Sequence, residues 1–327
     1  MSEVLINTSP QASQGPDLAE KPKRFSAKSD SAYWIVLYGV TGLFALVLVA
    51  FLLSIIGSSI PAWRSSGLKL IFGTTWDPNN DVFGALPLIA GTVESTLIAL
   101  FLAIPIGLGT ALAIVHMIPR RFRVFFSSLV ELLAAVPSVV YGLWGLLVVA
   151  PWFQVTVQPA LEKATGNHWP FSGQEEGVSL LLAGFILFVM VLPLVVALSR
   201  DVIAVVPNDQ VEGALSLGAS QWQVLRKVVL PGARTGIIGA ITLATARALG
   251  ETVAVAMVIG GNPLFPHSTF STAATLASTI ALEFAEATPA QVAALGALAV
   301  ILMAMTAFVN WVGRRMVQRA AIRAGGK

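Results

Sequence analysis

The feature that most constrains this 327-residue chain is a series of long apolar runs in which charged side chains are almost absent. About 20 consecutive apolar residues are enough for a helix to cross the hydrocarbon core of a bilayer. Six runs reach that length, so the sequence predicts an all-α, polytopic membrane protein. The six expected transmembrane helices cover residues 31–60, 86–118, 124–150, 178–199, 236–260 and 289–312.

The composition excludes the main alternatives to a membrane protein. Charged residues make up 11% of the chain and apolar residues 56%, whereas an ordinary soluble domain is about 25% charged. A soluble fold of this size could not cover its surface with so few charges. The absence of cysteine excludes a disulfide scaffold. A net charge of +3 is too small to indicate a nucleic-acid partner, and we expect lipid to surround the chain.

The basic residues predict how the chain is oriented, because Lys and Arg gather in cytoplasmic segments. With the N-terminus inside, the external segments hold only Arg64, Lys69 and Lys163. We therefore expect both termini in the cytoplasm of a cell whose inner or plasma membrane holds this chain. The expected cytoplasmic segments are a disordered tail at 1–30, a short loop at 119–123, a long loop at 200–235 and a basic tail at 313–327; the external ones are 61–85, 151–177 and 261–288.

The long loop at 200–235 carries its own pattern of helix signals. Asn208 begins a short helix, and Gly218 breaks it. Ser220 and Gln223 form an S-x-x-Q capping box that opens a second helix, which we expect Pro231 to end. On physical grounds two interpretations are equally good. The loop is either a connector that packs on its own bundle or a docking element for a cytoplasmic partner.

Charges inside the expected spans are the second functional signal, since each costs about 2.5–3.5 kcal/mol on insertion scales. Arg247 and Glu251 are four residues apart in the fifth span, so we expect them to share a helix face. They form either an internal ion pair or a cationic site for an anionic substrate. Arginine suits phosphate because its planar fork bonds two oxygens at once. Glu94 and Glu131 are further candidates for intramembrane polar partners, either of Arg247 or of exposed backbone.

The sequence offers no pattern typical of an enzyme. His116, His168 and His267 stand alone, and no GxxxxGK[ST] phosphate loop is present. We expect no catalytic residue, no metal site and no cofactor in this chain. A secondary transporter or channel that uses the four intramembrane charges remains a possible function from a different class.

The long loop resembles the EAA motif of ABC importer permeases, which couples a Glu-Ala-Ala triplet to a glycine and an Ile-x-Leu-Pro run. Two positions depart from that motif, because Gly213 stands for alanine and Val228 for isoleucine. The resemblance implies that this loop is the coupling helix that contacts an ATPase subunit. The matching residues are Glu212, Gly213, Ala214, Gly218, Val228, Leu230 and Pro231.

Three further stretches are similar to the phosphate-specific ABC importer permeases of the PstC type: LPLIAGTVESTLIALFLAIPIG, ELLAAVPSVVYGLWGLLVVAP and ARALGETVAVAMVIGG. The resemblance covers about residues 33–315. It implies a type I importer fold with the coupling helix between the fourth and fifth spans, and a permease core at 86–312. It also implies a PstA-like second permease, two PstB-like ATPases that hydrolyse ATP, a PstS-like extracytoplasmic binding protein, and a role in phosphate translocation for Arg247 and Glu251. A permease for another oxyanion is the nearest alternative.

Overall fold

The computed structural model describes residues 27–166, 168–173 and 176–323. The chain divides into two units between Leu53 and Ser54, and helix α1 (Ala27–Ser66) crosses that division. The predicted disordered tail, 1–30, lies outside the described residues except for 27–30, which begin α1. Every other element belongs to the larger unit.

Helices dominate the larger unit, and one two-stranded hairpin is the exception to the all-α prediction among the described residues. Five-residue π turns and short 3-10 turns interrupt the helices. In chain order the elements are α2 (Lys69–Phe72), β1 (Trp76–Asp77), η1 (Pro78–Asn80), β2 (Val82–Phe83), α3 (Leu86–Leu112), η2 (Ala113–Met117), α4 (Arg120–Ala134), α5 (Ser138–Trp144), η3 (Gly145–Val149), α6 (Ala150–Trp152), η4 (Phe153–Val157), α7 (Gln158–Thr165), α8 (Leu180–Ala204), α9 (Asn208–Ser216), α10 (Gln221–Val224), η5 (Leu225–Val229), α11 (Leu230–Leu249), α12 (Val253–Val258), α13 (Leu276–Glu283), η6 (Phe284–Glu286) and α14 (Pro289–Arg323).

Six helical stretches among the described residues are long and apolar enough to cross a membrane, as the sequence predicts. All six overlap the expected ranges, although the third and the fifth are displaced. The last helix continues to Arg323, so most of the predicted basic tail at 313–327 is helical. The six stretches are Tyr33–Ser66, Leu86–Met117, Ser138–Thr165, Leu180–Ala204, Gln221–Leu249 and Pro289–Ile322.

The predicted third span, 124–150, is wrong in its bounds. Its first part belongs to α4, a separate amphipathic helix that ends at Ala134. The span itself starts at Ser138 and runs to Thr165. Pro137 causes the break, because it has no N–H to donate and disfavours helical backbone at Val136. The predicted external segment at 151–177 is therefore largely helical.

The predicted fifth span, 236–260, is also displaced, and Pro231 does not end a helix. The helix runs without interruption from Gln221 to Leu249. The π turn η5 lies just before the proline, and in this turn the Leu230 N–H donates to the Leu225 carbonyl five residues back. The wider turn gives room for the proline ring, which collides with the carbonyl four residues back in a regular helix. Pro151 and Pro159 follow π turns at the same spacing.

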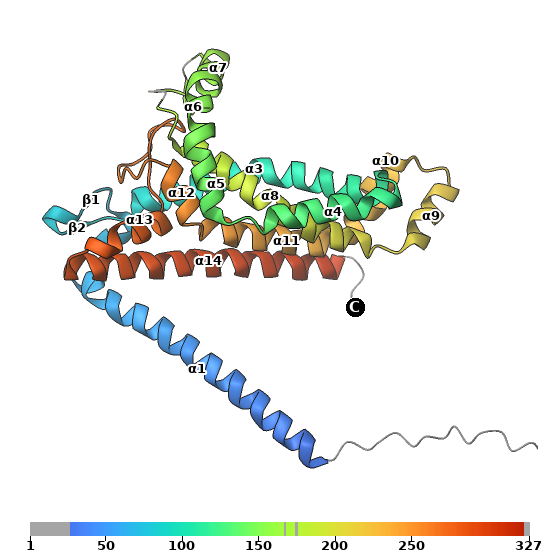
Figure 1. The fold of residues 1–327 in the computed structure, drawn as a ribbon, viewed down its shortest axis with the longest axis horizontal. Coiled ribbons are helices and arrows are strands. Elements are labelled where there is room, and N and C mark those ends of the chain that lie inside the picture. The colour runs from blue at the N-terminus through green and yellow to red at the C-terminus, as the bar shows by residue number, and fades with distance from the viewer. Residues whose placement is uncertain (1–26, 167, 174–175, 324–327) are drawn as a thin grey trace, which may run out of the picture. The chain divides into compact units, whose positions relative to one another are not determined.

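Four helices, α3, α8, α11 and α14, run side by side and form the body of the larger unit (Figure 1). The central helix α8 buries side chains on most of its circumference, among them Leu182, Ile186 and Val191. Glycine allows two close crossings: a Cβ on Gly107 would lie 2.7 Å from Val195 Cγ1, and one on Gly145 would lie 2.9 Å from Ile186. Small residues thus let these helices approach closely.

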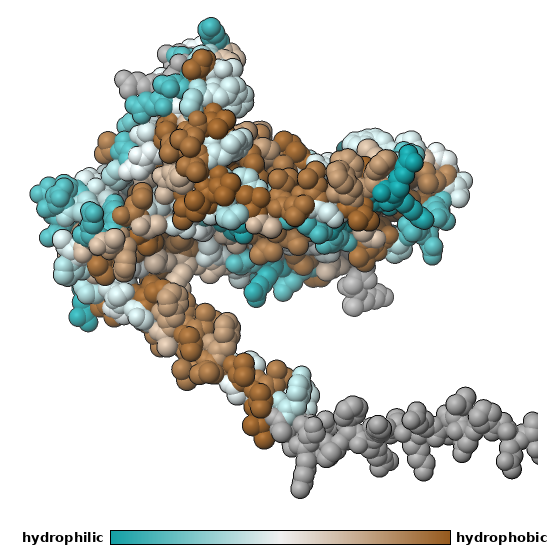
Figure 2. All heavy atoms as spheres, in the orientation of Figure 1, coloured by the Kyte–Doolittle hydropathy of each residue, from teal (hydrophilic) through white to brown (hydrophobic). Residues whose placement is uncertain are grey.

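Hydrophilic residues gather over the β1–β2 hairpin, over α9 and α10, and over the tip at α7, and the surface between them is mostly apolar with a smaller hydrophilic group along the lower edge (Figure 2). The hairpin is held to the bundle by Trp76, whose indole Nε1 donates to both carboxylate oxygens of Glu283 at 3.2 and 3.1 Å. Gln291 also donates to Glu283, at 2.7 Å. This distribution is that of a multi-pass membrane protein with structured polar ends.

Candidate functional site

The helix that carries Arg247 ends two residues later. At Leu249 the helix α11 stops, Gly250 takes a C-cap position with φ −90° and ψ 0°, and α12 begins at Val253. Glu251 lies in the intervening turn, where its Oε1 accepts from the Ala254 N–H at 3.4 Å. Glu251 therefore helps to cap the start of α12. The prediction that Arg247 and Glu251 share one helix face is wrong, because Gly250 breaks the helix between them.

The internal ion pair, one of the two interpretations of these charges, is absent from the structure. Among the described residues, Arg247 makes no ion pair and no side-chain hydrogen bond, and its side chain is exposed. An exposed guanidinium in an apolar span is costly unless something outside this chain compensates it. The arrangement favours a cationic site that faces a path or a neighbouring subunit.

The wall beside this site comes from α5. A Cβ on Gly142 would lie 3.0 Å from Ala254 Cα and 2.8 Å from Met257 Sδ, so α5 and α12 touch almost at the backbone. One residue earlier, the Tyr141 hydroxyl donates to the Leu133 carbonyl of α4 at 2.8 Å. Tyr141 thus fixes α5 to the end of α4, and we call this junction, residues 133–141, the α4–α5 corner. Helix α5 also packs against α12, which follows the turn after Arg247. Sequence reasoning missed Tyr141, which carries no charge and lies in an apolar run.

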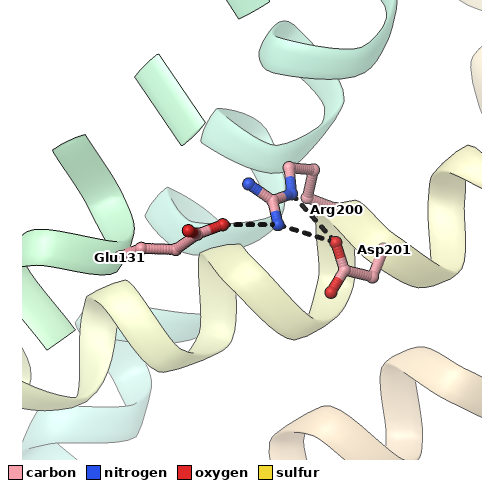
Figure 3. Close-up of polar contacts among 3 residues, drawn as sticks. All are labelled: Glu131, Arg200 and Asp201. Atoms are coloured by element: carbon pink, nitrogen blue, oxygen red, sulfur yellow. Dashed lines mark hydrogen bonds and ion pairs between the residues drawn. The ribbon is translucent and has the colours of Figure 1, made fainter. Parts of the chain in front are cut away.

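The two other acids that the sequence predicts to be intramembrane have different environments: Glu94 lies in the second span, whereas Glu131 lies on α4, outside the six candidate spans. Glu131 of α4 pairs with Arg200 of α8, not with Arg247: its Oε1 is 3.1 Å from Arg200 Nη2 (Figure 3). Glu94 of α3 is half-buried, and within the described part of the chain it has no ion pair and no side-chain hydrogen bond. Neither acid pairs with Arg247. Arg200, which the sequence analysis left aside, adjoins Asp201 at the end of a charge-free run.

The loop after α8 has the helix–turn–helix form that the sequence predicts. The first helix, α9, ends in a Schellman motif, because the Ala219 N–H donates to the Ala214 carbonyl at 3.1 Å and the Gly218 N–H donates to the Leu215 carbonyl at 2.9 Å. Gly218 has φ +84°, the left-handed conformation that glycine adopts at least cost. The motif residues therefore lie on a defined turn.

The second helix of this loop opens with the predicted capping box. The Gln223 N–H donates to Ser220 Oγ at 3.3 Å, and the Ser220 N–H donates to Gln223 Oε1 at 2.9 Å. The two helices of this loop line a pocket of about 330 Å³. Large apolar side chains project outward beside it: Leu217 is 91% exposed and Trp222 64%. Exposed apolar side chains on an ordered turn are typical of a docking surface.

The seven motif residues occupy both faces of this loop. Glu212, Gly213, Gly218 and Pro231 are exposed, and Ala214, Val228 and Leu230 are half-buried. Beneath them, Val224, Leu225 and Val229 pack with Ile203 and Ala233 into a small core. The loop therefore packs on its own bundle and also presents an exposed outer face.

No group of three or more His, Cys, Asp or Glu side chains within the described ranges is arranged to hold a metal ion. The candidate site consists of Arg247 beside a helix break and, separately, the helix–turn–helix loop at 208–231.

Comparison with known proteins places the chain in a class. The family of binding-protein-dependent transport system inner membrane components matches residues 103–318, well over half of the chain. The chain belongs to this family, and it is a permease component of an ABC importer.

Curated relatives match over nearly their whole length. The chain is 39% identical over 287 residues to the phosphate transport system permease protein PstC of Haemophilus influenzae, and the matched region covers 85% of this chain and 91% of that protein. It is 38% identical over 278 residues to the protein of the same name in Mesorhizobium japonicum, covering 84% and 85%. The Xylella fastidiosa protein of that name is 33% identical over 329 residues, covering 99% and 100%.

Solved structures share the fold at low sequence identity. A chain of a bacterial alginate ABC transporter, crystallised in complex with alginate pentasaccharide-bound periplasmic protein, has a TM-score of 0.59 at 16% identity and covers 89% of this chain and 97% of that chain. A chain of the inward-facing MetNI methionine ABC transporter has a TM-score of 0.53 at 19% identity, covering 72% and 96%. The helical architecture is that of ABC importer permeases.

Proposed function

We propose that this chain is the transmembrane subunit of an ATP-driven importer that moves inorganic phosphate into the cytoplasm. The observation that carries the proposal is the exposed Arg247, which has no ion pair within the described residues. A guanidinium without an intramolecular counter-charge attracts an anion, and its fork matches the oxygens of phosphate. The relatives named as phosphate transport permeases support this choice of anion.

The same proposal assigns a role to each partner subunit of the importer. A second, PstA-like permease covers the face that exposes Arg247, and the two subunits enclose the path. Two PstB-like ATPases hydrolyse ATP and contact the loop at Asn208–Pro231, whose exposed Leu217 and Trp222 suit an apolar groove. A PstS-like binding protein delivers phosphate from outside. This chain performs no catalysis and binds no cofactor of its own.

The orientation belongs to the proposal as well. Both termini lie in the cytoplasm, because most Lys and Arg then lie on the cytoplasmic side. The loop at Asn208–Pro231 lies on that side, within reach of an ATPase. The β1–β2 hairpin lies outside, where a binding protein arrives.

The test is phosphate uptake by the assembled complex in proteoliposomes. We expect labelled phosphate to accumulate only when ATP and the binding protein are both supplied. Import of sulfate or another oxyanion in place of phosphate would favour the alternative oxyanion permease. Uptake by the permease pair alone, without the ATPase, would point to a secondary transporter or channel and contradict the proposal.

A further inference from the structure

One ion pair connects the peripheral helix α4 to the helix that enters the loop. Glu131 Oε1 lies 3.1 Å from Arg200 Nη2, and no other ion pair in the described ranges joins two helices (Figure 3). The helix α4 has no buried residue of its own. Side-chain burial therefore does little to hold α4 in one position against α8, and a directional polar contact has correspondingly more influence.

The Arg200 side chain is largely shielded from solvent, whereas the side chains of the two acids that contact it are more exposed. The Arg200 side chain is 16% exposed, against 60% for Glu131 and 63% for Asp201. Asp201 Oδ1 accepts from Arg200 Nη2 at 2.8 Å and from Nε at 3.0 Å. Since Asp201 belongs to the same helix as Arg200, it orients the guanidinium without joining two elements. Of the two acids that bond Arg200, only Glu131 belongs to another helix.

The Arg200 end of this pair lies close to the loop that we assign to ATPase contact. The helix α8 ends at Ala204, and α9 begins at Asn208 after three residues. Ile203 packs in the same small core as Val224 and Val229, beneath the loop. A displacement of α9 therefore moves the end of α8 that carries Arg200.

The Glu131 end lies close to the candidate phosphate site. The helix α4 ends at Ala134, three residues after Glu131, and the Tyr141 hydroxyl bonds the Leu133 carbonyl across the break at Pro137. From Tyr141 the next residue of α5 is Gly142, which touches α12. A shift of α4 is thus passed through the α4–α5 corner to the turn that follows Arg247.

We infer that the Arg200–Glu131 ion pair is a positioning contact that passes movement of the loop at Asn208–Pro231 to the α4–α5 corner beside Arg247. This inference rests on the proposed function, because it assigns the coupling between ATP hydrolysis and import to two named residues. Neutralising Arg200 leaves Glu131 without its opposite charge, whereas neutralising Glu131 leaves Arg200 paired with Asp201 alone. The ion pair between α4 and α8 is then lost, while the loop and Arg247 stay intact.

The experiment compares variants in the complete importer complex, reconstituted in proteoliposomes. The variants are Glu131→Gln, Arg200→Gln, the exchange Glu131→Arg with Arg200→Glu, and the matched control Asp201→Asn. ATP hydrolysis and uptake of labelled inorganic phosphate are measured in the same vesicles and expressed as phosphate imported per ATP. This ratio separates coupling from assembly, because a lower amount of complex reduces both rates together.

We expect each single neutralisation to leave ATP hydrolysis within about twofold of wild type and to lower phosphate per ATP about tenfold, within the usual range of coupling between sites. The exchange restores an opposite-charge pair between α4 and α8 but places its new carboxylate beside Asp201, so we expect it to raise the ratio in part. Asp201→Asn keeps the wild-type ratio, because Arg200 still bonds Glu131.

Two results would overturn the inference. One is an unchanged ratio in an assembled single variant. The other is failed assembly of both single variants with assembly and import recovered together by the exchange, since the pair would then be a folding contact only. The proposed function is judged separately by the wild-type complex: if that complex imports no phosphate with ATP, the function fails whatever the variants do.

Discussion

Arg247 and Glu251 are four residues apart in the sequence, yet they serve two different helices. Arg247 lies in the last turn of α11, which ends at Leu249, and Glu251 accepts a hydrogen bond from the Ala254 N–H at the start of α12. Glu251 is thereby engaged with backbone, and Arg247 keeps its positive charge unneutralised by any described side chain. The two residues therefore have separable roles, and substitution can distinguish them.

Arg247→Gln is expected to lower phosphate import about 100-fold, the scale seen when one preorganised donor to an anion is removed. Insertion and ATPase binding should be normal, because no described side chain depends on this guanidinium. Arg247→Lys keeps the charge but loses the fork, so import should be partial at best. The measurement is uptake per assembled complex, with the exposed Arg319→Gln as a control for loss of positive charge. Near-normal import by the double variant Arg247→Leu with Glu251→Leu would show that Arg247 has no substrate role.

Glu251→Ala is expected to lower the free energy of unfolding by about 0.5–1 kcal/mol, because the first turn of α12 loses an acceptor for the Ala254 N–H. Glu251→Gln keeps an oxygen acceptor in the same place and should stay near wild type. Thermal unfolding of the purified complex measures both. Equal stability of the alanine and glutamine variants would mean that the cap contributes nothing.

Gly218→Val is expected to impair ATPase association, because a β-branched residue at φ +84° costs about 1–3 kcal/mol and distorts the turn. The matched control is Gly213→Ala in the same loop. A Cβ on Gly213 meets nothing within 4 Å, and alanine favours a helix over glycine by about 1 kcal/mol. Copurification of the ATPase with each variant is the measurement. Wild-type association and import in Gly218→Val would show that the loop is only a connector.

Reporter fusions test the orientation, which rests on the distribution of Lys and Arg. Fusions after Ser66, Gly173 and Ser268 are expected to report an external location. Fusions after Gly218 and Gly325 are expected to report a cytoplasmic one. An external location at Gly218 would contradict both the topology and the ATPase contact.

Trp76→Phe is expected to destabilise the β1–β2 hairpin by about 1–2 kcal/mol, because the half-buried Glu283 carboxylate loses its indole donor and the smaller phenyl ring fills less of the space of the buried indole. Limited proteolysis across residues 74–84 measures this loss. Asn79→Ala is the control: Asn79 is exposed, and the backbone N–H through which it bonds Asp77 is retained. Equal cleavage of wild type and Trp76→Phe would mean that the indole does not anchor the hairpin.

Features that depend on local sequence could be predicted from the sequence. The apolar runs identify six spans because membrane insertion requires about 20 apolar residues in succession, whatever they later contact. Gly218 and the Ser220–Gln223 capping box were also predicted, since both depend on hydrogen bonds within a few residues. The break at Pro137 has a local cause as well, but average hydropathy conceals it because both sides of the break are apolar.

Pairing between distant residues was decided only by the tertiary structure. Arg200 and Glu131 are 69 positions apart, and nothing in either segment specifies the other. Likewise, Arg247 and Glu251 have a spacing that suits an ion pair on one helix, but the helix ends between them at Gly250, and α12 then packs against Gly142 of α5. The sequence by itself determined that charged side chains, Glu94 and Arg247 among them, lie within long apolar runs. Their partners depend on how the helices pack, because charge pairing acts through space over a few ångströms and is independent of separation along the chain.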